Sequence, residues 1–189
     1  EDDVLILAGD LSWAGNLRDA LPDLERVGAM KGRKILIKGN HDYWWETKSK
    51  LKRFLHPSIQ LVQTQSVIVE RIAMAGTRGW VCPGSELFQA EDEKIYIREV
   101  GRLKLALESL RGREKEYDHL VVALHYPPTN ENRAPSGFTE LIGEHGAGIC
   151  LFGHLHGEST RLAITGLHGK TTYHLCSADY VDFCPVRVI

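Results

Sequence analysis

The sequence predicts an α/β fold with at least one mixed β-sheet. Short apolar segments typical of buried strands alternate with amphipathic helical segments towards both ends of the chain. Between them lies a group of closely spaced strand-like segments with short connections. The 189 residues contain no internal repeat or low-complexity linker, and they are too few for two comfortable domains. We therefore expect residues 1–189 to form a single domain.

The strands are indicated by short apolar runs that end at turn-forming residues. The first run, residues 4–8, stops at Gly9, and its unbroken apolar character suits a strand buried on both faces. The segments within residues 59–74 follow one another so closely that we interpret them as a meander. Strands are predicted over residues 4–8, 34–38, 59–62, 66–69, 71–74, 119–124, 148–152, 171–176 and 185–188.

The helices are indicated by apolar residues at helical spacing and by capping residues. Asn16 is a suitable N-cap for the first helix, in which Pro22 should cause a kink or a restart. Ser136 is a suitable cap for the last helix. Helices are predicted over residues 16–30, 46–55, 92–116 and 138–145.

Composition and charge narrow the class of protein. The formal net charge of −2 gives no support for a surface that coats nucleic acid, and no apolar run approaches the roughly 20 residues of a membrane span. No cysteines stand at C-x-x-C spacing, and Cys150 and Cys176 lie in apolar runs, so we expect buried thiols and a cytoplasmic location. The chain opens on acidic residues without Met, and we expect it to be an N-terminally truncated fragment.

Metal-competent side chains follow four of the predicted strands. These strand ends read Gly9-Asp10, Gly39-Asn40-His41-Asp42, His125 and Gly153-His154-Leu155-His156. A single Gly-Asp is more often an ordinary turn, and a single histidine is a weak signal. Ligands of open α/β sheets bind beyond the carboxyl ends of strands, so four such ends can build one cluster. His154 and His156, at positions i and i+2, can point to the same side of an extended segment.

In this order, the four segments resemble the motif set of the calcineurin-like metallophosphoesterases. The resemblance runs from residue 9 to residue 156. Residues 39–45, 76–80 and 125–130 further resemble a microbial branch of predicted phosphohydrolases. The resemblance implies two mixed β-sheets in a sandwich flanked by helices, a four-layer α/β/β/α order whose first strand is missing from this chain.

The resemblance also implies roles. Asp10 would bridge two metal ions, and His156 would belong to the first of them. Asn40, His125 and His154 would complete the second. His41 would stand beside the metals and assist the leaving group or stabilise charge on the phosphate. The implied cofactors are two divalent or trivalent ions of Mn, Fe, Zn, Co or Ni, which would generate a bridging hydroxide as nucleophile.

Two departures from the family pattern stand out. The Asp-x-His pair of the first motif, which would supply further ligands of the first metal, is absent. Trp13 and Ala14 occupy the places of an Asp that orients the catalytic histidine and an Arg that grips phosphate. Arg78 is our candidate for substrate binding, and Arg133 is an alternative. A solvated loop arginine is the more ordinary interpretation of either.

The leading functional hypothesis is hydrolysis of a phosphate monoester or diester by a dinuclear metal centre. The expected partner is a small phosphorylated substrate, without a membrane, and the oligomeric state stays open. Tryptophans such as Trp13 and Trp80 could line a wall for a flat substrate, although tryptophans more often pack in a core or a lid. Two alternatives are a nuclease of the same fold, which the charge disfavours, and a non-catalytic scaffold that lacks a metal.

Overall fold

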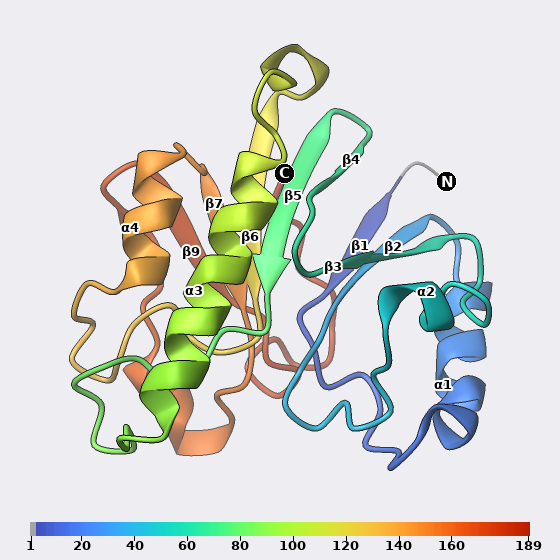
Figure 1. Ribbon diagram of the computed structural model, residues 1–189, viewed down its shortest axis with the longest axis horizontal. Coiled ribbons are helices and arrows are strands. Elements are labelled where there is room, and N and C mark those ends of the chain that lie inside the picture. The colour runs from blue at the N-terminus through green and yellow to red at the C-terminus, as the bar shows by residue number, and fades with distance from the viewer. Residues whose placement is uncertain (1–2) are drawn as a thin grey trace.

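The computed structural model describes residues 3–189, which form two β-sheets with helices against them (Figure 1). The smaller sheet has the order β1-β2-β3, and the larger has the order β4-β5-β6-β7-β9-β8. The α/β class and a mixed sheet are therefore confirmed. None of the helices within residues 3–189 combines the length and the apolar character that a membrane span requires.

The smaller sheet consists of β1 (Val4–Leu7), β2 (Arg33–Ile37) and β3 (Ile59–Val62). Both strand pairings of the smaller sheet are parallel. Within the described residues only the larger sheet is therefore mixed, and the expectation of two mixed sheets is wrong for the smaller sheet. Parallel strands need a crossover connection, which α1 (Leu17–Ala29) and the segment with α2 (Lys48–Leu51) provide.

The larger sheet has a parallel centre and antiparallel edges. Its parallel strands are β5 (Ile72–Thr77), β6 (His119–Leu124), β7 (Ile149–Phe152) and β9 (Thr171–Leu175). The edge strands β4 (Val67–Val69) and β8 (Gly166–His168) pair antiparallel with their neighbours. The crossovers carry α3 (Asp92–Glu108) and α4 (Gly137–Glu144), with short 3₁₀ helices η1 (Glu114–Glu116) and η2 (Gly157–Leu162).

Three clusters of buried side chains hold these elements together. One joins α3 and α4 to the larger sheet and contains Leu103 and Phe138. Another joins α1 and α2 to the smaller sheet and contains Leu24. The third contains Ile37 of the smaller sheet and Met74 of the larger one, so the two sheets pack on each other. Figure 1 shows the same arrangement, with α3 and α4 over the larger sheet and α1 and α2 beside the smaller one.

Several sequence-based expectations need correction. Residues 59–74 are not one meander, because β3 pairs with β2 in the smaller sheet while β4 and β5 form a hairpin in the larger. The helix expected over residues 46–55 shortens to α2, and that expected over residues 92–116 ends at Glu108. Residues 185–188 form no strand.

The predicted caps are confirmed. The side chain of Asn16 accepts the N–H of Asp19, and Ser136 forms a reciprocal capping box with Thr139 at the start of α4. Pro22 lies inside α1 without interrupting it. A proline this close to the N-terminus of a helix removes one backbone hydrogen bond, which the packing of the apolar face of α1 offsets.

Candidate metal centre

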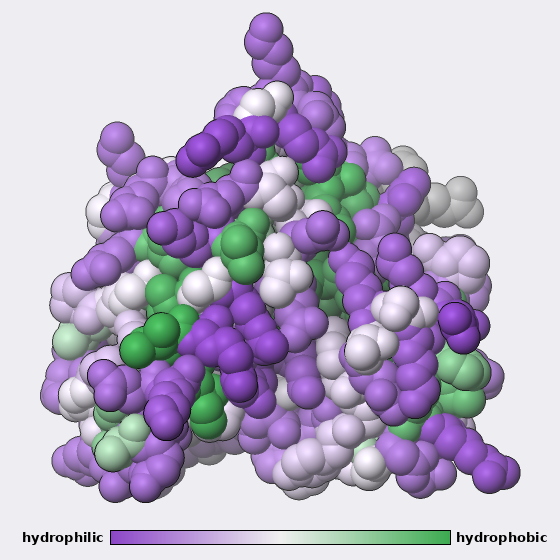
Figure 2. All heavy atoms as spheres, in the orientation of Figure 1, coloured by the Kyte–Doolittle hydropathy of each residue, from purple (hydrophilic) through white to green (hydrophobic). Residues whose placement is uncertain are grey.

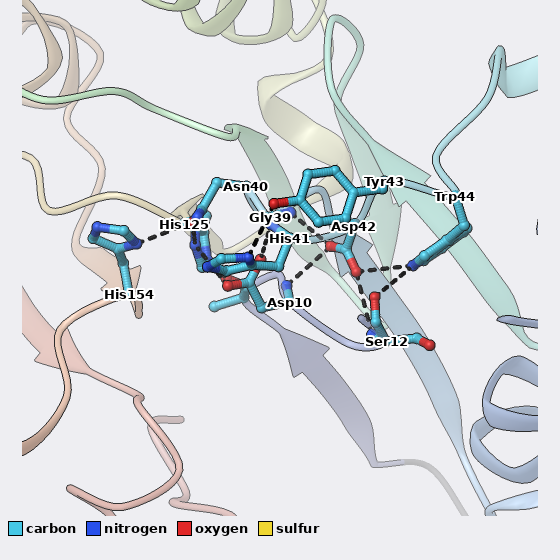
Figure 3. A network of polar contacts seen from close by, with 11 residues as sticks. Asp10, Ser12, Gly39, Asn40, His41, Asp42, Tyr43, Trp44, His125 and His154 are labelled. Atoms are coloured by element: carbon cyan, nitrogen blue, oxygen red, sulfur yellow. Dashed lines mark hydrogen bonds and ion pairs between the residues drawn. The ribbon is translucent and has the colours of Figure 1, made fainter. Parts of the chain in front are cut away.

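Four of the predicted ligands meet where β1, β2, β6 and β7 end (Figure 3). The amide oxygen Oδ1 of Asn40 lies 2.6 Å from Nε2 of His125 and 3.0 Å from Nδ1 of His154. Oδ2 of Asp10 lies 3.4 Å from Nε2 of His125. The structure therefore brings Asp10, Asn40, His125 and His154 together from both sheets, as the order of the motifs predicted.

The backbone at these strand ends adopts a conformation that few residues tolerate. Asp10 and His154 have φ angles of +55° and +71°, in the left-handed region, and such strain is concentrated at functional sites. Gly9, with φ of +93°, leaves no room for a side chain. A Cβ there would lie 2.7 Å from both the Cα of Gly39 and Nδ1 of His125. The glycines thus allow the strand ends to approach closely.

Asp42 fixes the two loops of the smaller sheet against each other. Its wholly buried carboxylate accepts the N–H groups of Gly39 at 2.7 Å, Asp10 at 2.9 Å and Ser12 at 3.3 Å, and Nε1 of Trp44 at 3.0 Å. Burial raises the pKa of Asp42, whereas the backbone donors oppose that rise. Four donors suit the ionised, acceptor-only carboxylate. The motif contained Asp42, but sequence reasoning gave it no role.

Burial disfavours the charged form of the two histidines of the site. Burial lowers the pKa of His125, and burial together with the proximity of His125 lowers the pKa of His154 to about 4. Nδ1 of His125 lies 2.8 Å from the carbonyl oxygen of Ala8. A neutral imidazole has one N–H, so if Nδ1 donates to Ala8, Nε2 turns its lone pair towards Asn40 and Asp10.

Nitrogen and oxygen lone pairs that face one another fit a shared metal cation. The set of two imidazoles, one amide oxygen and one carboxylate suits Mn, Fe, Zn, Co or Ni. Within residues 3–189, no group of three or more His, Cys, Asp or Glu side chains has a geometry that could hold a metal ion. The amide oxygen of Asn40 is the atom that lies close to both histidines. The assignment of these four residues to the second metal of a pair stays a prediction.

His156 contacts Asp179 and not the hydrogen-bonded residues of this cluster within residues 3–189. Its Nδ1 is 2.7 Å from Oδ1 of Asp179, whose other oxygen accepts the N–H of Gly157 at 2.7 Å. These hydrogen bonds, with that of Gly157 the larger cause, lower the pKa of Asp179. Sequence reasoning missed Asp179. It follows β9, belongs to no motif, and is 23 residues away from His156 in the sequence. Asp10 and His156 alone do not make a first metal site.

His41 stands beside the cluster between two aromatic rings. Its backbone N–H donates to Oδ1 of Asp10 at 2.8 Å. Its ring stacks on that of Trp13, with centroids 4.0 Å apart and planes 10° apart, and the hydroxyl of Tyr43 lies 3.4 Å from Nδ1. Trp13, at the position where the family would have an orienting Asp, thus holds the plane of His41 by stacking.

Comparison with known proteins shows the family of the chain. A sequence model of the calcineurin-like phosphoesterases matches residues 1–158. The chain belongs to this family. Membership supports phosphoester hydrolysis as the general class of reaction. A solved structure described as a protein of unknown function, AQ665 from Aquifex aeolicus, is 16% identical, with 97% of this chain and 72% of that chain covered and a TM-score of 0.44. No curated protein matches the chain significantly.

The arginine predicted to bind substrate in this member of the calcineurin-like phosphoesterase family lies next to the site but already has other partners. Arg78 follows β5, its guanidinium stacks 4.3 Å above the ring of Trp80, and its Nη2 lies 3.5 Å from Glu99. The alternative, Arg133, donates to the carbonyl of Arg161 at 3.4 Å. Of the tryptophans, Trp44 is buried, whereas Trp13 is exposed beside His41 and is available to a substrate.

Proposed function

We propose that the chain hydrolyses a phosphate monoester or diester with a pair of metal ions held at the carboxyl ends of its strands. The observation that carries this proposal is the convergence of Asp10, Asn40, His125 and His154 from four separate strands. Family membership supports the reaction class independently of that geometry. When bound, the two cations would neutralise phosphate charge and lower the pKa of a water between them.

Each residue of the site then has a role. Asp10 would contact both cations, and Asn40, His125 and His154 would complete the second. His156 would face the first through Nε2, because its Nδ1 is taken by Asp179. A carboxylate on the far nitrogen orients a metal-binding imidazole and raises its basicity. The first cation needs further ligands, for which the predicted source is an Asp-x-His pair that this sequence does not contain.

His41 would act on the ester oxygen that leaves. Its backbone hydrogen bond to Asp10 places it next to the proposed bridging carboxylate, and its Nε2 is free because Tyr43 contacts Nδ1. A positioned imidazole that donates a proton to a leaving group accelerates hydrolysis by roughly 10²–10⁴-fold. Stacking on Trp13 would keep that nitrogen aimed at the substrate.

The test is hydrolysis of p-nitrophenyl phosphate and bis-p-nitrophenyl phosphate by the full-length protein with Mn²⁺. His154→Ala and Asp10→Asn should abolish release of p-nitrophenol, because each removes a donor of the cluster. His119→Ala is the matched control, since His119 is exposed at the opposite end of the strand that leads to His125. Undiminished turnover in both site variants would discard the proposal, and a full-length protein that binds no metal would favour the non-catalytic scaffold.

A further inference from the structure

A buried carboxylate surrounded by arginines lies beside the metal centre. Glu99 of α3 is wholly buried, and it accepts a hydrogen bond from the hydroxyl of Thr77. Nη1 of Arg102 lies 2.7 Å from its Oε1, and Nη2 of Arg78 lies 3.5 Å from the same oxygen. Arg98 approaches to 3.7 Å from the solvent side. A buried carboxylate requires charged or hydrogen-bonding partners of this kind, so Glu99 and its arginines hold one another in place.

The positive charges of this group exceed the negative ones. Lys38 lies near Glu99, Arg78 and Arg102. The other carboxylate near Lys38 is Asp42, whose oxygens are occupied by four N–H donors. The guanidinium groups of Arg78, Arg98 and Arg102 and the ammonium of Lys38 thus share one available carboxylate.

Arg78 keeps unused capacity for hydrogen bonding. Its Nε is buried and has no hydrogen-bond partner among residues 3–189, while the guanidinium is held over Trp80. Side chains of Arg78 and Arg102 are 17% and 31% exposed, so the group is recessed and can still be reached from solvent. Figure 2 shows strongly hydrophilic side chains gathered beside the lower half of α3, the helix that carries Glu99 and Arg102. Guanidinium groups held in fixed positions in this way suit the binding of a carboxylate or a phosphate.

The group lies one strand away from the proposed metal ligands. Thr77 pairs with Leu124 in the register of β5 and β6, so Arg78 lies opposite His125 and its carbonyl accepts the N–H of His125 at 3.1 Å. Adjacent strands are about 4.8 Å apart. Lys38 directly precedes Gly39 and Asn40. A small molecule whose phosphate lies at the cluster of Asn40 and His125 would therefore lie one strand away from the residue that carries the Arg78 guanidinium.

We propose that Lys38, Arg78 and Arg102 bind a second anionic group of the substrate, and that the substrate is a small phosphoester carrying another phosphate or a carboxylate. Glu99 is the positioning residue that holds the two arginines. This inference rests on the proposed function, because it takes the metal centre as the place where the ester is cleaved. The recessed position of the group favours a compact substrate over a polymer backbone.

The first test compares three aryl phosphates that differ only in the group opposite the ester: phenyl phosphate, 4-carboxyphenyl phosphate and 4-(phosphonomethyl)phenyl phosphate. The full-length protein should prefer one or both of the charged substrates by at least tenfold in kcat/KM, chiefly through a lower KM. The better of the two identifies the second group. Arg78→Gln and Arg102→Gln should each reduce that preference several-fold. Arg71→Gln, which removes a surface pair with Asp118, should leave the preference unchanged.

The second test needs no hydrolysis. Binding of pyrophosphate to metal-free protein, measured by calorimetry, should weaken at least fivefold in Arg102→Gln and Lys38→Gln, and unchanged affinity in both would overturn the proposal. Equal kcat/KM for the three aryl phosphates would overturn it while leaving the proposed function intact. If the protein hydrolyses none of the aryl phosphates but binds pyrophosphate in a way that depends on Arg102, the anion site is supported and the proposed function is overturned. If a single-stranded oligonucleotide competes for this site as strongly as pyrophosphate, at equal concentrations of phosphate groups, the assignment of a small substrate is overturned.

Discussion

Nδ1 of His156 lies 2.7 Å from Oδ1 of Asp179, which joins the segment after β7 to the segment after β9. The family match ends at residue 158, so this carboxylate lies outside the matched region. Its second oxygen accepts the N–H of Gly157, and the carboxylate is therefore held by two contacts on the same loop. This arrangement leaves Nε2 of His156 as the nitrogen that can bind a metal.

We expect Asp179→Asn to weaken metal binding by roughly 10–100-fold, the usual effect of losing a carboxylate that supports a metal-bound histidine. Calorimetric titration of the metal-free full-length protein with Mn²⁺ measures this without reference to activity. Asp182→Asn is the matched control, because Asp182 is exposed on the same segment and its φ of +51° suits asparagine. Equal Mn²⁺ affinity in Asp179→Asn and in the unaltered protein would contradict the assigned role.

Gly9→Ala should damage both stability and the site. A residue with a Cβ at φ of +93° is strained, and the new Cβ would press on Gly39 and on His125 at 2.7 Å. Strain of this kind costs about 1–3 kcal/mol, and displacement of His125 should weaken metal binding as well. Urea unfolding and Mn²⁺ titration check the two effects. Gly15→Ala is the control, since no atom lies within 4 Å of the position of its Cβ; a similar loss there would refute the steric reason.

The strands that carry the site were predictable because their pattern is local. The apolar runs that became β1, β2, β6 and β7 each end at or near the residue that the sequence marked. The assignment of β3 and β4 to different sheets was not predictable, because both are short apolar segments. The sheet that each strand joins depends on the strand it pairs with and on the side chains that pack against it. The sequence of residues 59–74 does not indicate that β3 pairs with β2 and β4 with β5.

The part of the candidate site that lies in sequence motifs was predictable. Asp10, Asn40, His125 and His154 converge because parallel strands place their carboxyl ends at one edge. The partners of the site residues were not predictable. Asp179 and Glu99 lie in no motif, and only the packing of the segment after β9 and of α3 brings them to His156 and Arg78. A buried glutamate in an amphipathic helix resembles any other polar position in the sequence.

Stability of the metal-free protein should fall as the pH is lowered from about 6.5 to about 4. The pKa of His154 is about 4 in the folded chain against an ordinary value of 6.5. In this range the unfolded chain therefore binds a proton at His154 and the folded chain does not, which favours unfolding. With allowance for partial exposure we expect a loss of roughly 2 kcal/mol.

Urea unfolding at several pH values, in the presence of a chelator, measures this dependence. His154→Asn should flatten it, and asparagine tolerates the φ of +71° at this position. His168→Asn, at an exposed edge strand, should leave the slope unchanged. A His154→Asn slope as steep as that of the unaltered protein would assign the pH dependence to other groups.

Lys34 should contribute more to stability than any exposed lysine. It lies in β2, is wholly buried, and its ammonium donates to the carbonyls of Gly28 at 3.2 Å, Met30 at 2.5 Å and Gly32 at 2.9 Å. Three donors on one cation satisfy carbonyls at the C-terminal end of α1, where a positive charge is favourable. Lys34→Met keeps the aliphatic stem and removes all three bonds, so we expect a loss of about 3 kcal/mol in urea unfolding. Lys50→Met removes only a surface pair with Glu46 and should cost about 0.5 kcal/mol. An equal loss of unfolding free energy in the two variants would contradict this prediction and would mean that water satisfies the three carbonyls in place of the Lys34 ammonium.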